Sequence, residues 1–310
     1  MSPRAFVGVD AAASVMTGEA ARPDSAPTVK SAEILRLKMK RPHWSARMIE
    51  AARAGAHAIG PPLITVTLLL LIWQIAAGSP TSSLPSPLKV LDDSWDIIAA
   101  PLRVGKGIDQ GLFWHIAASL GRVANGYALA AVVGIALGVL LGQSTIAMKG
   151  LDPIFQVLRT VPPLAWLPLS LAAFRDGRPS AIFVIFITSV WPIIINTTVG
   201  VRNIPADYRN VARVLRLSPL EYFIKIMMPA CVPHMFTGLR IGIGLSWLAI
   251  VAAEMLIGGV GIGFFIWDAW NSSRISDIIV ALIYVGLVGF SLDRVVAYAG
   301  RLVSRGTAAT

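Results

Sequence analysis

Apolar residues gather along this chain in six long runs separated by polar stretches. Each run is near the ~20 residues that an α-helix needs to cross a bilayer. Pro162, Pro163 and Pro168 interrupt the third run, and a spanning helix tolerates prolines where neighbours satisfy the freed backbone groups. We therefore expect that helix to be kinked and to lie inside the bundle. The predicted spans are Ile59–Ala77, His115–Leu141, Pro153–Phe174, Ala181–Val201, His234–Ile257 and Ile278–Ala299.

The polar stretch between the fourth and fifth runs, Asn203–Pro229, is the docking loop. Its pattern predicts a first short helix over Asp207–Leu217, with apolar side chains on one face and arginines on the others. Ser218, Pro219 and Glu221 then carry the signature of a second helix: an N-cap serine, a proline at the first position and a glutamate closing a capping box. We expect this second helix to end with the loop. Two ordered helices between spans predict a docking element for a partner.

The first of these helices carries the predicted docking surface. Val211, Val214 and Leu215 share its apolar face, and short helices that insert into grooves bind through apolar anchors at this spacing. Basic side chains surround that face and are expected to meet an acidic rim. The predicted docking residues are Tyr208, Arg209, Asn210, Val211, Ala212, Arg213, Val214, Leu215, Arg216, Leu217 and Ser218.

Composition indicates an integral membrane protein. Of the 310 residues, 55% are hydrophobic and 14% are charged, whereas about a quarter of a soluble domain is charged. The net charge of +10 could suggest nucleic-acid binding. Because much of this charge lies in the N-terminal tail and loops, the positive-inside bias of membrane proteins explains it better, and no nucleic-acid partner is expected. The single cysteine, Cys231, excludes an intrachain disulfide.

Charge also predicts the orientation. Nine Lys/Arg precede residue 59 and five lie in 201–233, whereas 78–114 carries three against four Asp and 258–277 carries one. The N-terminus, the docking loop and the C-terminus are therefore expected in the cytoplasm. The predicted organisation is a cytoplasmic tail over 1–58, a first span and periplasmic loop over 59–115, a core of five spans over 116–300 with the loop at 203–229, and a cytoplasmic tail over 301–310.

The N-terminal tail contains two kinds of sequence. Residues 1–28 are rich in Ala, Pro and Ser, a composition typical of disorder. Residues 31–53 alternate basic and apolar side chains, with Pro42 interrupting the pattern. This segment is either an amphipathic helix on the inner leaflet or a solvated basic tail. The first apolar run begins near Ile59, too late for a secretory signal.

The docking loop resembles a motif of a known family. Permease subunits of binding-protein-dependent ABC importers have a cytoplasmic EAA motif, Glu-Ala-Ala-x3-Gly-x9-Ile-x-Leu-Pro. The matching positions are Asn210, Val211 and Ala212, then Arg216 at the Gly, then Ile226, Met228 and Pro229. The spacing holds while the Glu and Gly are replaced. The sequence of residues 237–273 resembles the nitrate/bicarbonate/cyanate branch of this family, which is similar to the sulfonate and taurine permeases. The resemblance to the family covers about residues 84–305.

This resemblance implies an all-α integral membrane protein with six transmembrane helices and the type I ABC importer permease fold. It implies a multi-pass subunit of the bacterial inner (plasma) membrane that imports a small inorganic anion, nitrate first, with bicarbonate, cyanate or an aliphatic sulfonate as alternatives. The implied partners are cytoplasmic ABC ATPase subunits, a periplasmic or lipid-anchored substrate-binding protein and a second permease copy, expected to form a homodimer. No cofactor is expected in this chain, because ATP and Mg would be bound by the ATPase subunits.

Polar side chains inside the spans are candidates for an anion pathway, because burying ionisable groups in a bilayer is costly. Arg240, Trp247 and Glu254 share one stripe of the fifth span. Alternatively, Arg240 reaches the membrane interface and Glu254 pairs for structure. Arg122 and Glu254 are expected at similar depth, where they either pair, as we favour, or Arg122 alone attracts the anion. The candidate pathway residues are Arg122, Asn125, Thr188, Asn196, Arg240, Ser246, Trp247 and Glu254.

Glycines predict close helix contacts. The second and fifth spans carry small-xxx-small ladders, which let helix backbones approach closely in a membrane. We expect these ladders to pack within the chain rather than to form a dimer seam. The ladder residues are Gly134, Gly138 and Gly142 in the second span and Gly238 and Gly242 in the fifth.

Several chemistries are absent from the sequence. No GxxxxGK[ST] phosphate loop occurs, so the chain alone is not expected to hydrolyse ATP. Gly259, Gly261 and Gly263 form GxGxG without a dinucleotide fingerprint, and we expect them to be the flexible outer end of the fifth span. The four histidines lack metal spacing, and no GxSxG elbow occurs. A membrane enzyme is therefore disfavoured, and a passive anion channel is the main alternative to a permease.

Overall fold

A computed structural model describes residues 44–79, 82–105 and 107–307, and every regular element within these ranges is helical. This confirms the predicted all-α class. The disorder expected for 1–28 and part of the amphipathic segment lie outside the described residues. The elements are α1 (Trp44–Ala77), α2 (Pro87–Asp93), α3 (Trp95–Ala99), η1 (Gly107–Asp109), α4 (Leu112–Gln143), α5 (Thr145–Thr160), η2 (Pro163–Trp166), α6 (Leu167–Phe174), α7 (Gly177–Arg202), α8 (Ala206–Val214), α9 (Pro219–Tyr222), η3 (Phe223–Met227, a π-helical turn), α10 (Met228–Ile257), α11 (Ile262–Asn271) and α12 (Ile275–Thr307).

Five helices in the described residues are long and apolar enough to cross a membrane, and a bent pair supplies the sixth candidate. The spanning helices are Ile59–Ala77, Leu112–Gln143, Gly177–Arg202, Pro219–Ile257 and Ile275–Ser304. The first ends at Ala77 as predicted, and the others extend beyond their predicted apolar runs. α1 itself begins at Trp44, so residues 44–53 of the amphipathic segment are helical. The chain divides after Pro62 into two units, and the helices from Leu63 onward form the second.

The third predicted span is a broken helix. α5 and the η2–α6 segment meet at an angle of 93°, so the predicted kink is confirmed and sharper than a bend within one helix. The predicted position inside the bundle is wrong for α5, which has no buried residue within this chain. Pro163 is the first residue of η2 and Pro168 is the second residue of α6. A helix N-terminus leaves those N–H groups unbonded in any case, so these prolines require no interior partner.

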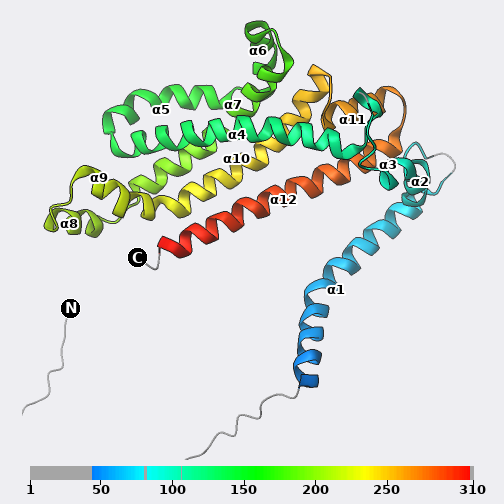
Figure 1. Cartoon of the computed structure of the whole chain (residues 1–310), viewed down its shortest axis with the longest axis horizontal. Coiled ribbons are helices and arrows are strands. Elements are labelled where there is room, and N and C mark those ends of the chain that lie inside the picture. Colours follow the sequence, from blue (N-terminus) through cyan, green and yellow to red (C-terminus); the bar gives the residue numbers. More distant parts are fainter. Residues whose placement is uncertain (1–43, 80–81, 106, 308–310) are drawn as a thin grey trace, which may run out of the picture. The chain divides into compact units, whose positions relative to one another are not determined.

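α7 packs against both α4 and α10 along most of its length (Figure 1). The glycine ladders explain this close packing. A Cβ on Gly134 would lie 2.8 Å from Ile193 Cγ2, and a Cβ on Gly238 would lie 2.8 Å from the Pro192 carbonyl oxygen. The ladders of both spans therefore face α7, and the expectation that they pack within the chain is confirmed. Without water to drive association, this close backbone approach holds the three helices together.

α12 packs along α10, and the two helices are joined by polar contacts as well as apolar ones (Figure 1). The Trp247 indole N–H donates to the Val285 carbonyl at 2.9 Å. Nearer the C-terminus of α12, Arg240 forms an ion pair with Asp293. Because Ser304, near the C-terminus of α12, lines a groove together with residues of the docking loop, this end of α12 and the docking loop lie at the same end of the bundle.

Candidate functional sites

The docking loop begins with α8, which ends in a Schellman motif. The Leu217 N–H donates to the Ala212 carbonyl at 3.0 Å, and the Arg216 N–H donates to the Arg213 carbonyl at 3.1 Å. This motif requires a left-handed residue after the C-cap, and Arg216 supplies it with φ of 49°. Arg216 stands at the glycine of the family motif, so the backbone keeps the glycine conformation although the residue is replaced.

The predicted apolar docking face lies on the surface. Val211, Val214 and Leu215 are 50%, 82% and 63% exposed. Ala212, on the other side of α8, is buried, and Ile204 before α8 joins a cluster with Met227 of η3. The helix is thus anchored on one side and presents apolar side chains on the other. Of the eleven predicted docking residues, Ala212 alone is buried and Leu217 is half-buried.

The second helix of the loop begins as predicted and ends differently. Ser218 and Glu221 form the capping box, in which the Glu221 N–H donates to Ser218 Oγ at 3.2 Å and the Ser218 N–H donates to Glu221 Oε2 at 3.0 Å. The predicted end by Pro229 is wrong, because α9 continues through η3 into α10. The wider π turn lets the helix pass Pro229, whose ring would clash with a carbonyl in an uninterrupted α-helix.

A groove lies beside α8. Its volume is about 500 Å³, and Tyr208 and Val211 of α8, Ile226 of η3, and Pro233 of α10 contribute to its walls. Ser304 of α12 also lines it. The exposed face of α8 therefore continues into a concave surface formed by the ends of the spanning helices.

A cluster of polar groups surrounds Glu254 near the other end of α10. Arg122 Nη1 of α4 lies 2.5 Å from Glu254 Oε1, Ser119 Oγ donates to Oε2 at 2.8 Å, and the Gly263 N–H donates to Oε2 at 3.0 Å. The side chains of Arg122 and Glu254 are 18% and 3% exposed, so the carboxylate of Glu254 is buried and the guanidinium group of Arg122 is partly buried. The predicted pair is confirmed, and Ser119 and Gly263 are additional partners that sequence reasoning missed.

The GxGxG segment forms part of this Glu254 cluster. A Cβ on Gly261 would overlap the Glu254 carboxyl group, and a Cβ on Gly263 would lie 2.9 Å from Glu254 Cβ. The Gly261 N–H donates to His115 Nδ1 at 3.3 Å, and the Ile262 N–H donates to Ser119 Oγ at 3.0 Å. The expectation of a flexible outer end is therefore wrong: Gly261 and Gly263 let the backbone close over the carboxylate, and its N–H groups donate hydrogen bonds to His115, Ser119 and Glu254.

The remaining pathway candidates lie in two environments. Thr188, Ser246 and Trp247 are buried inside the chain. Asn125, Asn196 and Arg240 are at least partly exposed. The stripe of α10 from Arg240 to Glu254 bonds within the chain along its length, to Asp293, Val285 and Arg122. This matches the alternative in which these groups have structural partners. A pathway role for the partly exposed residues stays a prediction.

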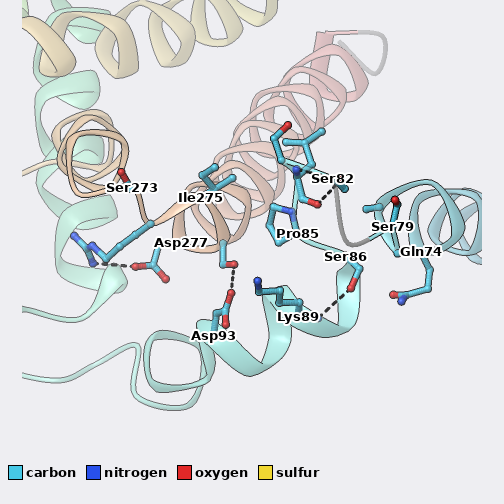
Figure 2. A pocket seen from close by; sticks show the side chains of 16 residues that line it. Gln74, Ser79, Ser82, Pro85, Ser86, Lys89, Asp93, Ser273, Ile275 and Asp277 are labelled. Atoms are coloured by element: carbon cyan, nitrogen blue, oxygen red, sulfur yellow. Dashed lines mark hydrogen bonds and ion pairs between the residues drawn. The ribbon is translucent and has the colours of Figure 1, made fainter.

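The end of the bundle opposite the docking loop contains a polar pocket of about 670 Å³, lined by the end of α1, by α2 and by the start of α12 (Figure 2). Its walls are tied by short hydrogen bonds. Ser276 donates to Asp93 at 2.7 Å and Ser94 donates to Asp277 at 2.7 Å. Arg274 bridges Asp268 at 2.6 Å and Asp277 at 2.9 Å. These contacts fasten the α2–α3 turn to the α11–α12 turn, and sequence reasoning missed them.

Comparisons with known proteins agree with this geometry. The family model described as "Binding-protein-dependent transport system inner membrane component" matches residues 130–305. The "Nitrate import permease protein NrtB" of Leptolyngbya laminosa is 64% identical over 244 residues, which is 78% of this chain and 87% of that protein. The "Bicarbonate transport system permease protein CmpB" of Synechocystis sp. is 53% identical over 249 residues, 79% of this chain and 89% of that protein.

A solved structure shares the fold. The inward-facing "MetNI methionine ABC transporter" aligns with a TM-score of 0.52 at 16% identity, over 61% of this chain and 92% of that one. At this identity the likeness concerns the fold alone. The type I ABC importer permease fold that the sequence resemblance implied is therefore confirmed.

Proposed function

The chain belongs to the binding-protein-dependent transport system inner membrane components, and from this premise we propose that it is the membrane-spanning permease of an ABC importer for nitrate. The 64% identity to a nitrate import permease supports nitrate as the cargo. Bicarbonate is the second candidate, because a bicarbonate permease is 53% identical over a similar length. The chain is a transport subunit and not an enzyme.

The exposed apolar face of α8 supports the proposal that ATPase subunits bind the docking loop. Val211, Val214 and Leu215 present an apolar surface at the tip of a loop whose base is buried. An apolar helix face of this kind fits the groove of a partner. We assign this face to cytoplasmic ABC ATPase subunits, which bind ATP and Mg and whose closure moves the loop.

The opposite end of the bundle faces the periplasm in this proposal. A periplasmic or lipid-anchored substrate-binding protein delivers the anion there, near the polar pocket lined by α2 and the start of α12 (Figure 2). Two copies of the chain form a homodimer and enclose the path between them. The exposed surface of α5 supports a contact with a second copy, because no α5 residue is buried within one chain. The protein lies in the bacterial inner membrane, with both chain termini in the cytoplasm.

The Glu254 cluster is compatible with an anion path. An unpaired carboxylate at this depth would repel an incoming anion and would be costly to desolvate. Arg122 cancels the charge of Glu254, and Ser119 and Gly263 donate to the same carboxylate. The cluster is therefore electrically neutral overall and acts as a structural clasp between α4, α10 and the segment before α11.

Uptake of labelled nitrate, bicarbonate and cyanate by cells with and without the chain tests the function. Nitrate uptake should depend on the chain and on the active-site residues of the partner ATPase. Uptake of bicarbonate alone would favour the second candidate. Anion entry that persists after the ATPase is inactivated would identify a passive channel and refute the importer.

A further inference from the structure

We infer that a pocket between α10 and α12, at the docking-loop end of the bundle, binds the headgroup of an anionic phospholipid. This inference rests on the proposed cytoplasmic position of the docking loop, which places the pocket at the inner leaflet. The pocket has a volume of about 610 Å³ and is lined by residues 233–240 of α10 and 294–304 of α12. We call it the lipid pocket.

The charge of the lipid pocket is unbalanced. Arg240, Arg294 and Arg301 line it, and Asp293 lies beside Arg240. Asp293 is occupied by Arg240, with Arg240 Nη2 at 2.7 Å from Oδ2. Among the residues that the structure describes, neither Arg294 nor Arg301 forms an ion pair. Arg294 stacks over the Phe290 ring at 4.7 Å, and Arg301 Nε donates to the Ala297 carbonyl at 3.4 Å. Two cationic groups remain available to an anion.

The floor of the lipid pocket is apolar. The Phe236 ring packs against Gly300, where a Cβ would lie 2.9 Å from Phe236 Cδ1. Val296 and Ala297 continue this floor along α12. Inorganic phosphate would make no favourable contact with this apolar surface. A phospholipid would cover it with the start of an acyl chain while its headgroup contacts the arginines. Basic pockets between spanning helices bind anionic headgroups in this way.

The depth of the lipid pocket agrees with the headgroup region on both helices. Phe236 lies about 31 Å along α10 from its outer end at Ile257, at 1.5 Å per residue. Arg301 lies about 39 Å along α12 from its outer end at Ile275, by the same rise. The hydrocarbon core of a bilayer is about 30 Å thick. Both helices therefore bring the pocket to the inner boundary of the membrane.

Native mass spectrometry of the assembled transporter in mild detergent tests the inference. The wild-type complex should retain phosphatidylglycerol in preference to phosphatidylethanolamine. The double variant Arg294→Gln/Arg301→Gln should lose about 25-fold in affinity, because each arginine near an anionic headgroup contributes about five-fold. The charge-preserving variant Arg294→Lys/Arg301→Lys should keep most of the binding.

Arg103→Gln/Arg178→Gln is the matched control, because both arginines are exposed, form no ion pair among the described residues and lie at the opposite end of the bundle. It removes the same charge and should retain the lipid. Equal retention by both double variants, or no preference for phosphatidylglycerol in the wild type, would overturn the inference. Displacement of the lipid by millimolar inorganic phosphate would show a simple anion site and would also overturn it. Copurification of the ATPase in the same samples reports separately on the proposed function.

Discussion

Arg216 holds a backbone conformation that costs a side chain about 1 kcal/mol, with φ of 49° at the end of α8. Arg216→Gly should remove this strain and, after the larger chain entropy of glycine is subtracted, stabilise the loop by roughly 0.5 kcal/mol. Arg216→Val should destabilise it, because a β-branched residue is least tolerant of positive φ. Limited proteolysis of the loop in the assembled transporter measures both changes. If Gly and Val variants lose the ATPase equally, the guanidinium group and not the backbone governs this position.

The Arg122–Glu254 pair allows a double-mutant test. Arg122→Ala should lower the free energy of unfolding by about 3 kcal/mol, because it leaves a buried carboxylate without its cation. Glu254→Gln should cost less, since Arg122 is the more exposed partner. The combined variant should recover part of the loss, with a coupling energy of about 1 to 3 kcal/mol. Unfolding in mixed micelles gives the four values, and simple additivity would remove the clasp from consideration.

At the scale of elements, α8 should behave as a separable docking unit. Leu215→Asp places a charge on the apolar face, where Leu215 is 63% exposed, and should abolish copurification of the ATPase while the chain still inserts. Val104→Asp is the matched control, because Val104 is 84% exposed and precedes α4 at the opposite end of the bundle. Retained assembly of the Leu215 variant would contradict the docking model.

The packing of α4 on α7 can be tested with two glycines of the same helix. Gly138→Ala places a Cβ 2.9 Å from the Ile194 carbonyl oxygen and should destabilise the chain by about 1 to 3 kcal/mol. Gly121→Ala meets nothing within 4 Å and should stabilise α4 by up to about 1 kcal/mol through helix propensity. Thermal unfolding of the two variants in detergent should shift in opposite directions. Shifts of the same sign would show that α4 does not depend on this contact.

For the whole molecule, the proposed orientation rests on the charge distribution and can be measured with cysteine labelling. Cys231 is buried, so replacing it with Ser gives a background without accessible thiols. In that background Ser83→Cys, at the polar pocket lined by α2 and the start of α12, should react with an impermeant maleimide in intact spheroplasts. Ala206→Cys, at the start of α8, should react only after the membrane is opened. The reverse labelling pattern would invert the topology and move the lipid pocket to the outer leaflet.

Sequence reasoning reached the features that local composition decides. Hydropathy predicted the first span with its end at Ala77, and Ser218 and Glu221 form the predicted capping box. The Arg122–Glu254 pair was also predictable, because counting turns from the span ends places both residues at one depth. Each of these predictions needed only helix geometry and the thickness of a bilayer.

Features that depend on tertiary approach were not predictable in the same way. Ser119 reaches Glu254 only because α4 packs near α10, and the glycines at 261 and 263 close over the carboxylate for the same reason. A signal was present in the alternating glycines that follow a buried glutamate, but in isolation such glycines indicate flexibility. The π turn of η3 had no signature except Pro229, which equally predicts the end of a helix.

The uninterrupted passage from α9 through η3 into α10 makes residues 219–257 a single rod about 58 Å long. At Gly238 and Gly242 the middle of this rod lies in close contact with α7, and the rod could pivot about this contact. The arm to Pro219 is about 32 Å and the arm to Glu254 about 21 Å, at 1.5 Å per residue. By these lengths, a pull of about 3 Å at the docking loop would displace Glu254 by about 2 Å, enough to take a hydrogen bond beyond its normal range. If ATPase subunits bind the docking loop as proposed, their closure at one membrane face would break the Arg122–Glu254 ion pair near the opposite face.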